Sequence, residues 1–121
     1  MSAHISGVEG SLVTVVLGGK LSRAELTTVQ EETAGVIQEL GKVCILVRAE
    51  QFAGWEKEGD WGDLSFQYEN DPFIERIAIV ADEKWEGLAL IFAGRGLRRP
   101  AIEFFPSSEL TRARLWATSA L

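Results

Sequence analysis

The sequence predicts an α/β domain with a mixed, mostly parallel sheet of about five strands and about four helices. Strand-like apolar runs alternate with amphipathic helical patterns along most of the chain, the order expected of parallel strands joined by right-handed crossovers. Two of the runs, residues 43–47 and 77–81, are apolar at every position, as in strands covered on both faces. The length of 121 residues, with 46% hydrophobic and 25% charged side chains, suits a single domain spanning residues 1–121.

Local signals place the elements of the N-terminal half. A short strand is expected at residues 5–8 and a second at 12–17, where apolar and β-branched side chains predominate. Ser22 and Glu25 have the spacing of a capping box, which starts a helix by satisfying two backbone N–H groups, and Gly41 is a natural end for that helix. The residues expected on its buried face are Leu26, Val29, Thr33, Val36, Ile37 and Leu40.

The C-terminal half continues the alternation. A helix is expected from Asp60, as its N-cap, to about residue 70, because the chain before Pro72 does not favour further helix. Asp82 is expected to cap the next helix, a loop at 94–100 leads to a strand at 101–105, and Ser107 or Ser108 is expected to cap the last helix. The inward-facing residues expected on these three helices are Trp61, Leu64 and Tyr68, then Trp85, Leu88 and Phe92, and finally Leu110, Ala113, Trp116, Ala117 and Ala120.

Composition argues against several classes of function. A net charge of −6 disfavours nucleic-acid binding, which needs a basic face for phosphate contacts. The single histidine, His4, cannot supply a multi-histidine metal site, and a histidine-dependent triad is not expected near the chain end. Cys44 lies in an apolar run and is expected to be a small buried hydrophobe. We therefore expect a protein that is not an enzyme and uses no metal or cofactor.

The location of the protein is predicted from its N-terminus and its hydropathy. The first ten residues have neither a basic start nor an apolar segment of the kind that marks a secretory signal. No apolar stretch approaches the roughly 18 residues that a membrane-spanning helix requires. These features predict a cytoplasmic protein.

Four segments together resemble the SpoIIAA-like family, a relative of the STAS domains. They are GGKLSRAEL at 18–26, GKVCILVRAEQFAGW at 41–55, ERIAIVADEKW at 75–85 and IEFFPSSELTRARLW at 102–116. The resemblance implies a β/α superhelix with strands roughly in sequence order, helices mainly on one face, and binding of a protein partner or a small ligand rather than catalysis. STAS-type anti-anti-sigma factors are switched by phosphorylation of a Ser or Thr after the central strand. The matching residues 47–61 contain neither, so this switch is not expected here.

The leading functional hypothesis from the sequence is a binding site for a small apolar or amphipathic ligand, exchanged at a membrane surface. Large aromatic side chains in elements next to glycine-containing loops suggest it, because ligand sites are mostly apolar with a few polar groups. The candidate ligand-binding residues are Trp55, Trp61 and Tyr68 on one side, Trp85, Phe92 and Leu97 opposite, and Gln67 and Arg95 as polar contacts. Basic side chains between residues 95 and 99 favour an anionic membrane surface, although a solvated loop is the simpler interpretation of them.

The alternative hypothesis is a STAS-type protein-interaction module, including self-association as a homodimer. Residues 50–75 contain eight acidic side chains and one lysine, and such a surface would select a basic partner. The candidate partner-binding residues are Glu56, Glu58, Asp60 and Asp63. Trp61 is expected to anchor the core, whereas Trp55 could equally cover the core or form an exposed binding edge.

Overall fold

A computed structural model describes residues 3–119. Its five strands form one sheet in the order β1-β2-β3-β4-β5. The strands are β1 (Ala3–Glu9), β2 (Leu12–Leu21), β3 (Val43–Trp55), β4 (Ile74–Ala81) and β5 (Ala101–Pro106). The helices are α1 (Arg23–Leu40), α2 (Ser65–Asn70), α3 (Glu86–Ala93) and α4 (Leu110–Thr118). This five-stranded α/β architecture confirms the predicted fold class.

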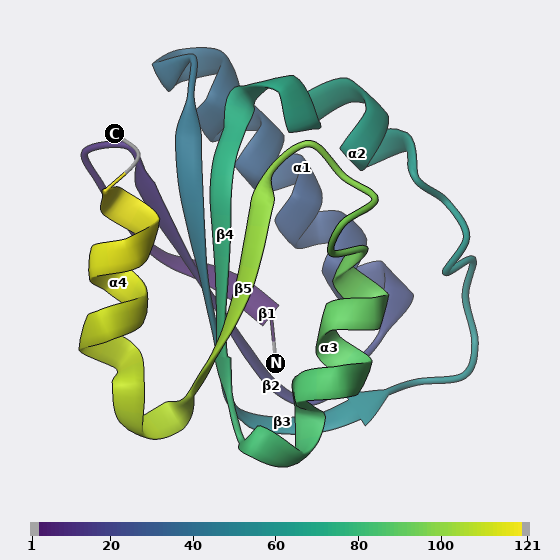
Figure 1. Ribbon diagram of the computed structural model, residues 1–121. Helices are drawn as coiled ribbons and strands as arrows, with labels where there is room; N and C mark the ends of the chain where they lie inside the picture. The colour runs from purple at the N-terminus through teal and green to yellow at the C-terminus, as the bar shows by residue number, and fades with distance from the viewer. Residues whose placement is uncertain (1–2, 120–121) are drawn as a thin grey trace.

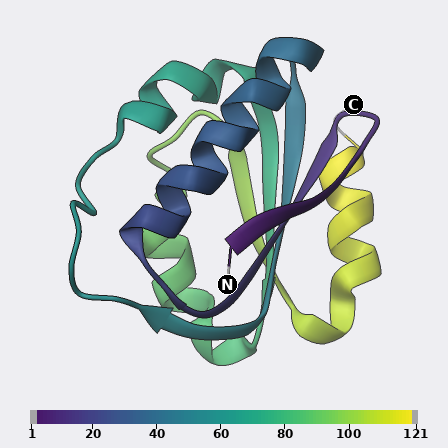
Figure 2. The ribbon, with the colours of Figure 1, turned by 180° about the vertical axis from the view of Figure 1, so that it is seen from behind.

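The sheet is parallel except at one edge. β1 pairs with β2 in the antiparallel sense, while β2, β3, β4 and β5 are parallel neighbours. Helices α1, α2 and α3, which connect the parallel strands, lie on one face of the sheet, and α4 lies alone on the other (Figures 1 and 2). Because β2, β3, β4 and β5 run parallel, the carboxyl ends of these four strands lie at the same edge of the sheet.

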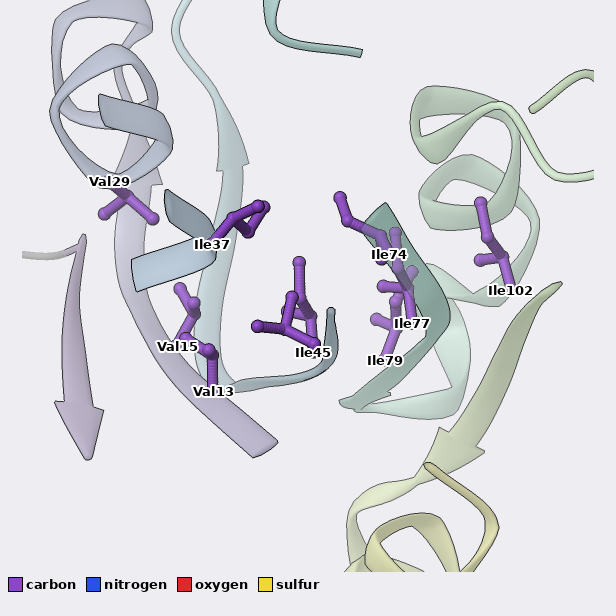
Figure 3. Packing of buried hydrophobic residues seen from close by; sticks show 10 residues of the cluster. Val13, Val15, Val29, Ile37, Ile45, Ile74, Ile77, Ile79 and Ile102 are labelled. Atoms are coloured by element: carbon purple, nitrogen blue, oxygen red, sulfur yellow. The ribbon is translucent and has the colours of Figure 1, made fainter. Parts of the chain in front are cut away.

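Two apolar clusters fill the two faces of the sheet. The larger cluster lies under α1, where Val29 and Ile37 pack with strand residues such as Val13, Ile45 and Ile77 (Figure 3). The smaller cluster lies under α4, where Ala113 and Ala117 are fully buried against Cys44, Leu46 and other strand residues. Strands with a helix layer on both sides need apolar residues at consecutive positions, which explains the unbroken apolar runs in β3 and β4.

Helix α1 begins as the sequence predicts. The Ser22 hydroxyl accepts a hydrogen bond from the Glu25 backbone N–H at 3.1 Å, and the Glu25 carboxylate accepts one from the Ser22 N–H at 3.0 Å. Gly41 caps the other end with φ 88°. Val29, Thr33 and Ile37 form its buried face as expected, whereas Leu40 is 44% exposed.

Strand β3 is much longer than the predicted residues 43–47. It continues to Trp55, and its second half pairs with the end of β2, where Gly18 lies opposite Gln51 and Leu21 opposite Trp55. Its pairing with β4 ends earlier, at Ala49 opposite Ala81. The extension carries little apolar periodicity because backbone pairing to β2, rather than burial of alternate side chains, keeps it extended. Trp55 therefore ends a strand instead of lying in a loop.

The helix predicted from Asp60 begins later, at Ser65. The Asp60 carboxylate accepts a hydrogen bond from the Gly62 N–H in a turn, and Asp63 accepts from the Ser65 N–H. These local bonds compete with helix formation, so α2 has only six residues. Tyr68 consequently lies on an exposed face, at 78%, and the prediction that it points inward is wrong. Leu64, just before α2, is 44% exposed but still borders the space between the helices and the sheet.

Two details of the last helices also differ from prediction. Leu88 is 55% exposed, while Ala89, Leu90 and Ala93 pack on the core. A 3₁₀ turn at Glu83–Trp85 precedes α3, and the Asp82 carboxylate caps this turn by accepting a hydrogen bond from the Lys84 N–H. The turn changes the face that α3 presents to the core. A 3₁₀ turn at Ser107–Glu109 likewise precedes α4, and neither start has a side-chain cap hydrogen bond from Ser107 or Ser108. Ala120 lies outside the described residues.

Candidate functional site

A cavity of about 220 Å³ lies between the larger helical layer and the sheet. Its floor is made of strand side chains such as Val47 and Ile79, and its walls come from α1 and α3. The extended end of β3 closes it at the edge where the parallel strands end. The cavity thus continues from the main apolar core, and most of its lining side chains are apolar.

Five aromatic side chains meet at one side of this cavity. Phe52 and Trp55 from β3 contact each other and Trp85, which precedes α3, with ring centroids 4.9 to 5.9 Å apart and steep interplanar angles. Phe92 of α3 lies 5.0 Å from Trp55 and 5.6 Å from Trp61. Four of these five ring pairs are edge-to-face, an arrangement that contributes stability beyond area burial. The aromatic cluster formed by these five side chains therefore joins β3, α3 and the segment after β3.

That segment, residues 56–64, crosses from the end of β3 to α2 (Figures 1 and 2), and we call it the strap. Trp61 is half-buried, and its indole N–H donates to the Glu56 carbonyl at 3.0 Å. Gly59 lies against the stem of Arg23, where an added Cβ would be 2.4 Å from the Arg23 Cβ. The Asp63 carboxylate forms an ion pair with the Arg23 guanidinium, with a nitrogen–oxygen distance of 3.7 Å. The strap is therefore attached to α1 through Arg23 and to α3 through Trp61 and Phe92.

Three side-chain polar atoms around the cavity are buried and have no hydrogen-bond partner within residues 3–119. They are the indole nitrogens of Trp55 and Trp85 and the side-chain oxygen of Gln67, and all three side chains line the cavity. A buried polar atom left unpaired costs about 1–3 kcal/mol, and an N–H that meets a ring face recovers only part of this. Buried polar atoms in native proteins are nearly always paired with protein or water. The presence of three unpaired ones around one cavity is therefore unusual.

Two arginines line the cavity and differ in how they are paired. Arg98 donates to both oxygens of Asp71, at 2.9 and 2.6 Å, and to the Ala93 carbonyl at 3.1 Å. Among residues 3–119, Arg23 has a 3.5 Å hydrogen bond to the Gln30 side-chain oxygen and the 3.7 Å ion pair with Asp63. Both arginine side chains are 15% exposed. The cavity therefore contains one guanidinium held by three short hydrogen bonds and one with weak partners.

The structure brings together five of the eight candidate ligand-binding residues. Trp55, Trp61, Trp85, Phe92 and Gln67 line the cavity. The other three do not: Tyr68 is 78% exposed, Leu97 is 91% exposed, and Arg95 pairs with Glu103 at 3.1 Å. Sequence reasoning did not identify Arg23, whose position at the start of α1 becomes part of the site only when the strap folds over it.

The four candidate partner-binding residues lie on the strap but in different environments. Glu56 and Glu58 are exposed, and Asp60 is exposed while holding the turn at Gly62. Asp63 lines the cavity and pairs with Arg23. Hydrogen bonds from the Ser65 hydroxyl and N–H lower the pKa of Asp63, and the nearby Arg23 charge adds to the effect. The acidic strap therefore has an outer surface and one inward-facing carboxylate.

Other sites considered from the sequence are also placed. Cys44 is fully buried, and burial raises the pKa of its thiol, which keeps it protonated and unreactive at neutral pH. Among residues 3–119, no group of three or more His, Cys, Asp and Glu side chains could hold a metal ion. No helix in this described part of the chain is long and apolar enough to cross a membrane.

Comparison with known proteins places the fold in a known group. Residues 12–118 match the family model described as SpoIIAA-like. An uncharacterized protein from Shewanella loihica with a SpoIIAA-like fold superposes with a TM-score of 0.69 over 96% of this chain and 93% of its own, at 18% sequence identity. At this identity the likeness concerns the fold alone. No curated protein matches the sequence.

Proposed function

This chain belongs to the SpoIIAA-like family, and from its cavity we propose that it is a non-enzymatic module that binds a small apolar or amphipathic ligand beneath the strap. The observation that carries the proposal is the coincidence of an apolar cavity with the three unpaired polar atoms of Trp55, Trp85 and Gln67. Ligand sites combine an apolar lining with a few polar groups that fix orientation. A ligand with both kinds of surface would fill the volume and meet some of these atoms.

The size of the cavity limits the ligand. A cavity of roughly 150 Å³ holds benzene, with its six carbon atoms. By the same proportion, about 220 Å³ accommodates about nine non-hydrogen atoms. The part of the ligand that the cavity encloses is therefore expected to be a single aromatic ring with a short substituent, or an aliphatic chain of about eight carbons. A full phospholipid is too large for this volume.

Native mass spectrometry of freshly purified protein tests the proposal, followed by organic extraction and analysis of small molecules. A co-purified compound of this size at near one-to-one stoichiometry is the expected result. Trp61→Ala should weaken its retention because Trp61 connects the strap to α3. Trp116→Ala is the matched control, since Trp116 packs against Phe105 on the opposite face of the sheet. Equal retention by the two variants would contradict the assignment of this cavity.

Ligand exchange at a membrane surface is part of this proposal. Ile91 and Leu97 near the end of α3 are 79% and 91% exposed, and exposed apolar side chains beside basic ones favour contact with an anionic membrane. Arg95 and Arg98 have acidic partners, so Arg99 is the basic side chain expected to meet the lipid headgroups. Sedimentation with anionic vesicles should decrease for Leu97→Glu, and unchanged sedimentation would remove the membrane from the proposal.

A protein-interaction module is the second candidate, supported by the outer surface of the strap. Glu56 and Glu58 are exposed, and neither has an ion-pair partner among residues 3–119, so both are free to meet a basic partner. The Glu56→Lys and Glu58→Lys double variant should keep the fold and ligand retention while losing association with such a partner or with a second copy. Analytical ultracentrifugation, with Glu83→Lys as a control elsewhere on the exposed surface, measures self-association directly.

A further inference from the structure

We propose that the ligand carries a carboxylate group and that this group binds Arg23 in place of Asp63. The inference rests on the proposed function, because it assigns the polar end of the molecule that occupies the cavity. It names the class of ligand as a small monocarboxylic acid with an apolar or aromatic body. It also assigns Asp63 as the side chain that the ligand replaces.

The pairing of Arg23 is the first step. A guanidinium has five N–H donors and no acceptors, and a charge taken out of water is costly unless it is well paired. The Arg23 side chain is only 15% exposed, yet within residues 3–119 its hydrogen-bond and ion-pair partners lie at 3.5 Å, on Gln30, and 3.7 Å, on Asp63. Charge-assisted N–H to oxygen bonds are normally about 2.7–2.9 Å long. Arg23 is therefore a mostly buried cation with unused donor capacity, and it lines the cavity.

Asp63 is a weak internal partner for this cation. Its side chain is 44% exposed, and one of its oxygens is already held by the Ser65 hydroxyl at 2.6 Å and the Ser65 N–H at 3.0 Å. Exposed ion pairs contribute little free energy because solvent screens them. A ligand carboxylate inside the cavity would approach Arg23 in less water and with both oxygens available. It would therefore compete successfully with Asp63.

Arg98 shows what a completed pair looks like in the same cavity. Its guanidinium binds both oxygens of Asp71 and the Ala93 carbonyl, the two-bond geometry that arginine and carboxylate groups favour. Three of its five N–H donors are used, and the Asp71 carboxylate already balances its charge. Arg23 also lies in the first turn of α1, where the positive end of the helix dipole favours an anion. These differences assign the acid group of the ligand to Arg23.

The test compares two probes of nearly equal size, octanoate and 1-octanol, at pH 7.5. Binding is measured by isothermal titration calorimetry and by intrinsic fluorescence, since Trp55, Trp61 and Trp85 line the cavity. We expect octanoate to bind about tenfold more tightly than 1-octanol. Arg23→Gln should remove this difference, and Asp63→Asn should strengthen octanoate binding by up to about fivefold while leaving 1-octanol unchanged. Arg95→Gln, outside the cavity, should have no effect.

Each outcome separates the inference from the proposed function. Equal affinity for the two probes, or a preference for octanoate that persists in Arg23→Gln, would overturn the assignment of the carboxylate while leaving a ligand-binding cavity. Weaker octanoate binding by Asp63→Asn would overturn the competition between the two carboxylates. Failure of both probes to bind the unmodified protein at millimolar concentration would count against the proposed function itself.

Discussion

Replacing Gly59 with alanine should detach the strap from α1. Gly59 has φ +111°, a conformation that residues with a Cβ rarely adopt, and its added methyl group would lie 2.4 Å from the Arg23 Cβ and 3.1 Å from the Cγ. The stem of Arg23 cannot move aside easily, because Arg23 is the first residue of α1 and is held by the helix backbone. The substitution therefore combines backbone strain with a steric clash.

The magnitude follows from these two effects. A non-glycine residue in such a conformation costs about 1–3 kcal/mol, and forcing an extra methyl group into a packed site costs about 1–3 kcal/mol. The strap can avoid both by leaving α1, at the expense of the Trp61 and Asp63 contacts. We therefore expect the free energy of unfolding to fall by about 2–4 kcal/mol. The dependence of that free energy on urea should also decrease, because a detached strap already exposes surface in the native state.

Urea denaturation and amide hydrogen exchange over residues 56–64 measure these effects. Substitutions at two other glycines separate the cost of backbone strain from the cost of the steric clash. Gly62→Ala, whose methyl group would meet only the Asp60 carboxylate at 3.5 Å, should change stability by less than about 0.5 kcal/mol. Gly96→Ala, with φ +84° and open space around it, should show the backbone cost alone, about 1–2 kcal/mol. If Gly59→Ala matched Gly62→Ala in both measurements, the contact between the strap and α1 would be refuted.

Three further predictions concern single side chains. Asp71→Asn leaves the mostly buried Arg98 without its charge partner and should lower the free energy of unfolding, measured by urea titration, by about 3 kcal/mol. The double variant Asp71→Leu with Arg98→Met removes both charges and should recover much of that loss. The lowered pKa of Asp63 means that its contribution to stability is present above its unfolded pKa and is lost as the pH falls through its folded pKa. Ser65→Ala should therefore move this loss to higher pH, as followed by NMR titration of the carboxyl group. Cys44 should react with a thiol reagent at pH 8 only at the rate of unfolding, because burial raises its pKa, and rapid labelling of the native protein would contradict this.

Most of the fold could be predicted because local and periodic signals agree with it. The capping box at Ser22 and the apolar runs of β3 and β4 each identify an element without reference to the rest of the chain. The extension of β3 could not be predicted, because residues 50–55 are held by backbone pairing to β2 and have no regular apolar pattern. Sequence periodicity detects buried faces, and a segment stabilised by a neighbouring backbone leaves no such pattern.

The candidate site was predicted in part for the same reason. Large aromatic residues in and around β3 and α3 are visible in the sequence, and the four predicted ones that line the cavity are Trp55, Trp61, Trp85 and Phe92. Tyr68 was misplaced because α2 begins at Ser65, which directs Phe66 toward the core instead. Arg23 has no distinguishing sequence signal, since its importance depends on how far Asp63 and Gln30 lie from its guanidinium.

The single helix on the far face has a consequence for biosynthesis. Leu12, Cys44, Leu46, Ala78 and Val80 on that face are covered by α4, which is the last helix in chain order. During translation the strands can pair as they emerge, but this apolar surface remains open until residues 110–118 have left the ribosome. A chain interrupted before Leu110 would present that surface to chaperones and proteases, so the covering of this face depends on the synthesis of α4.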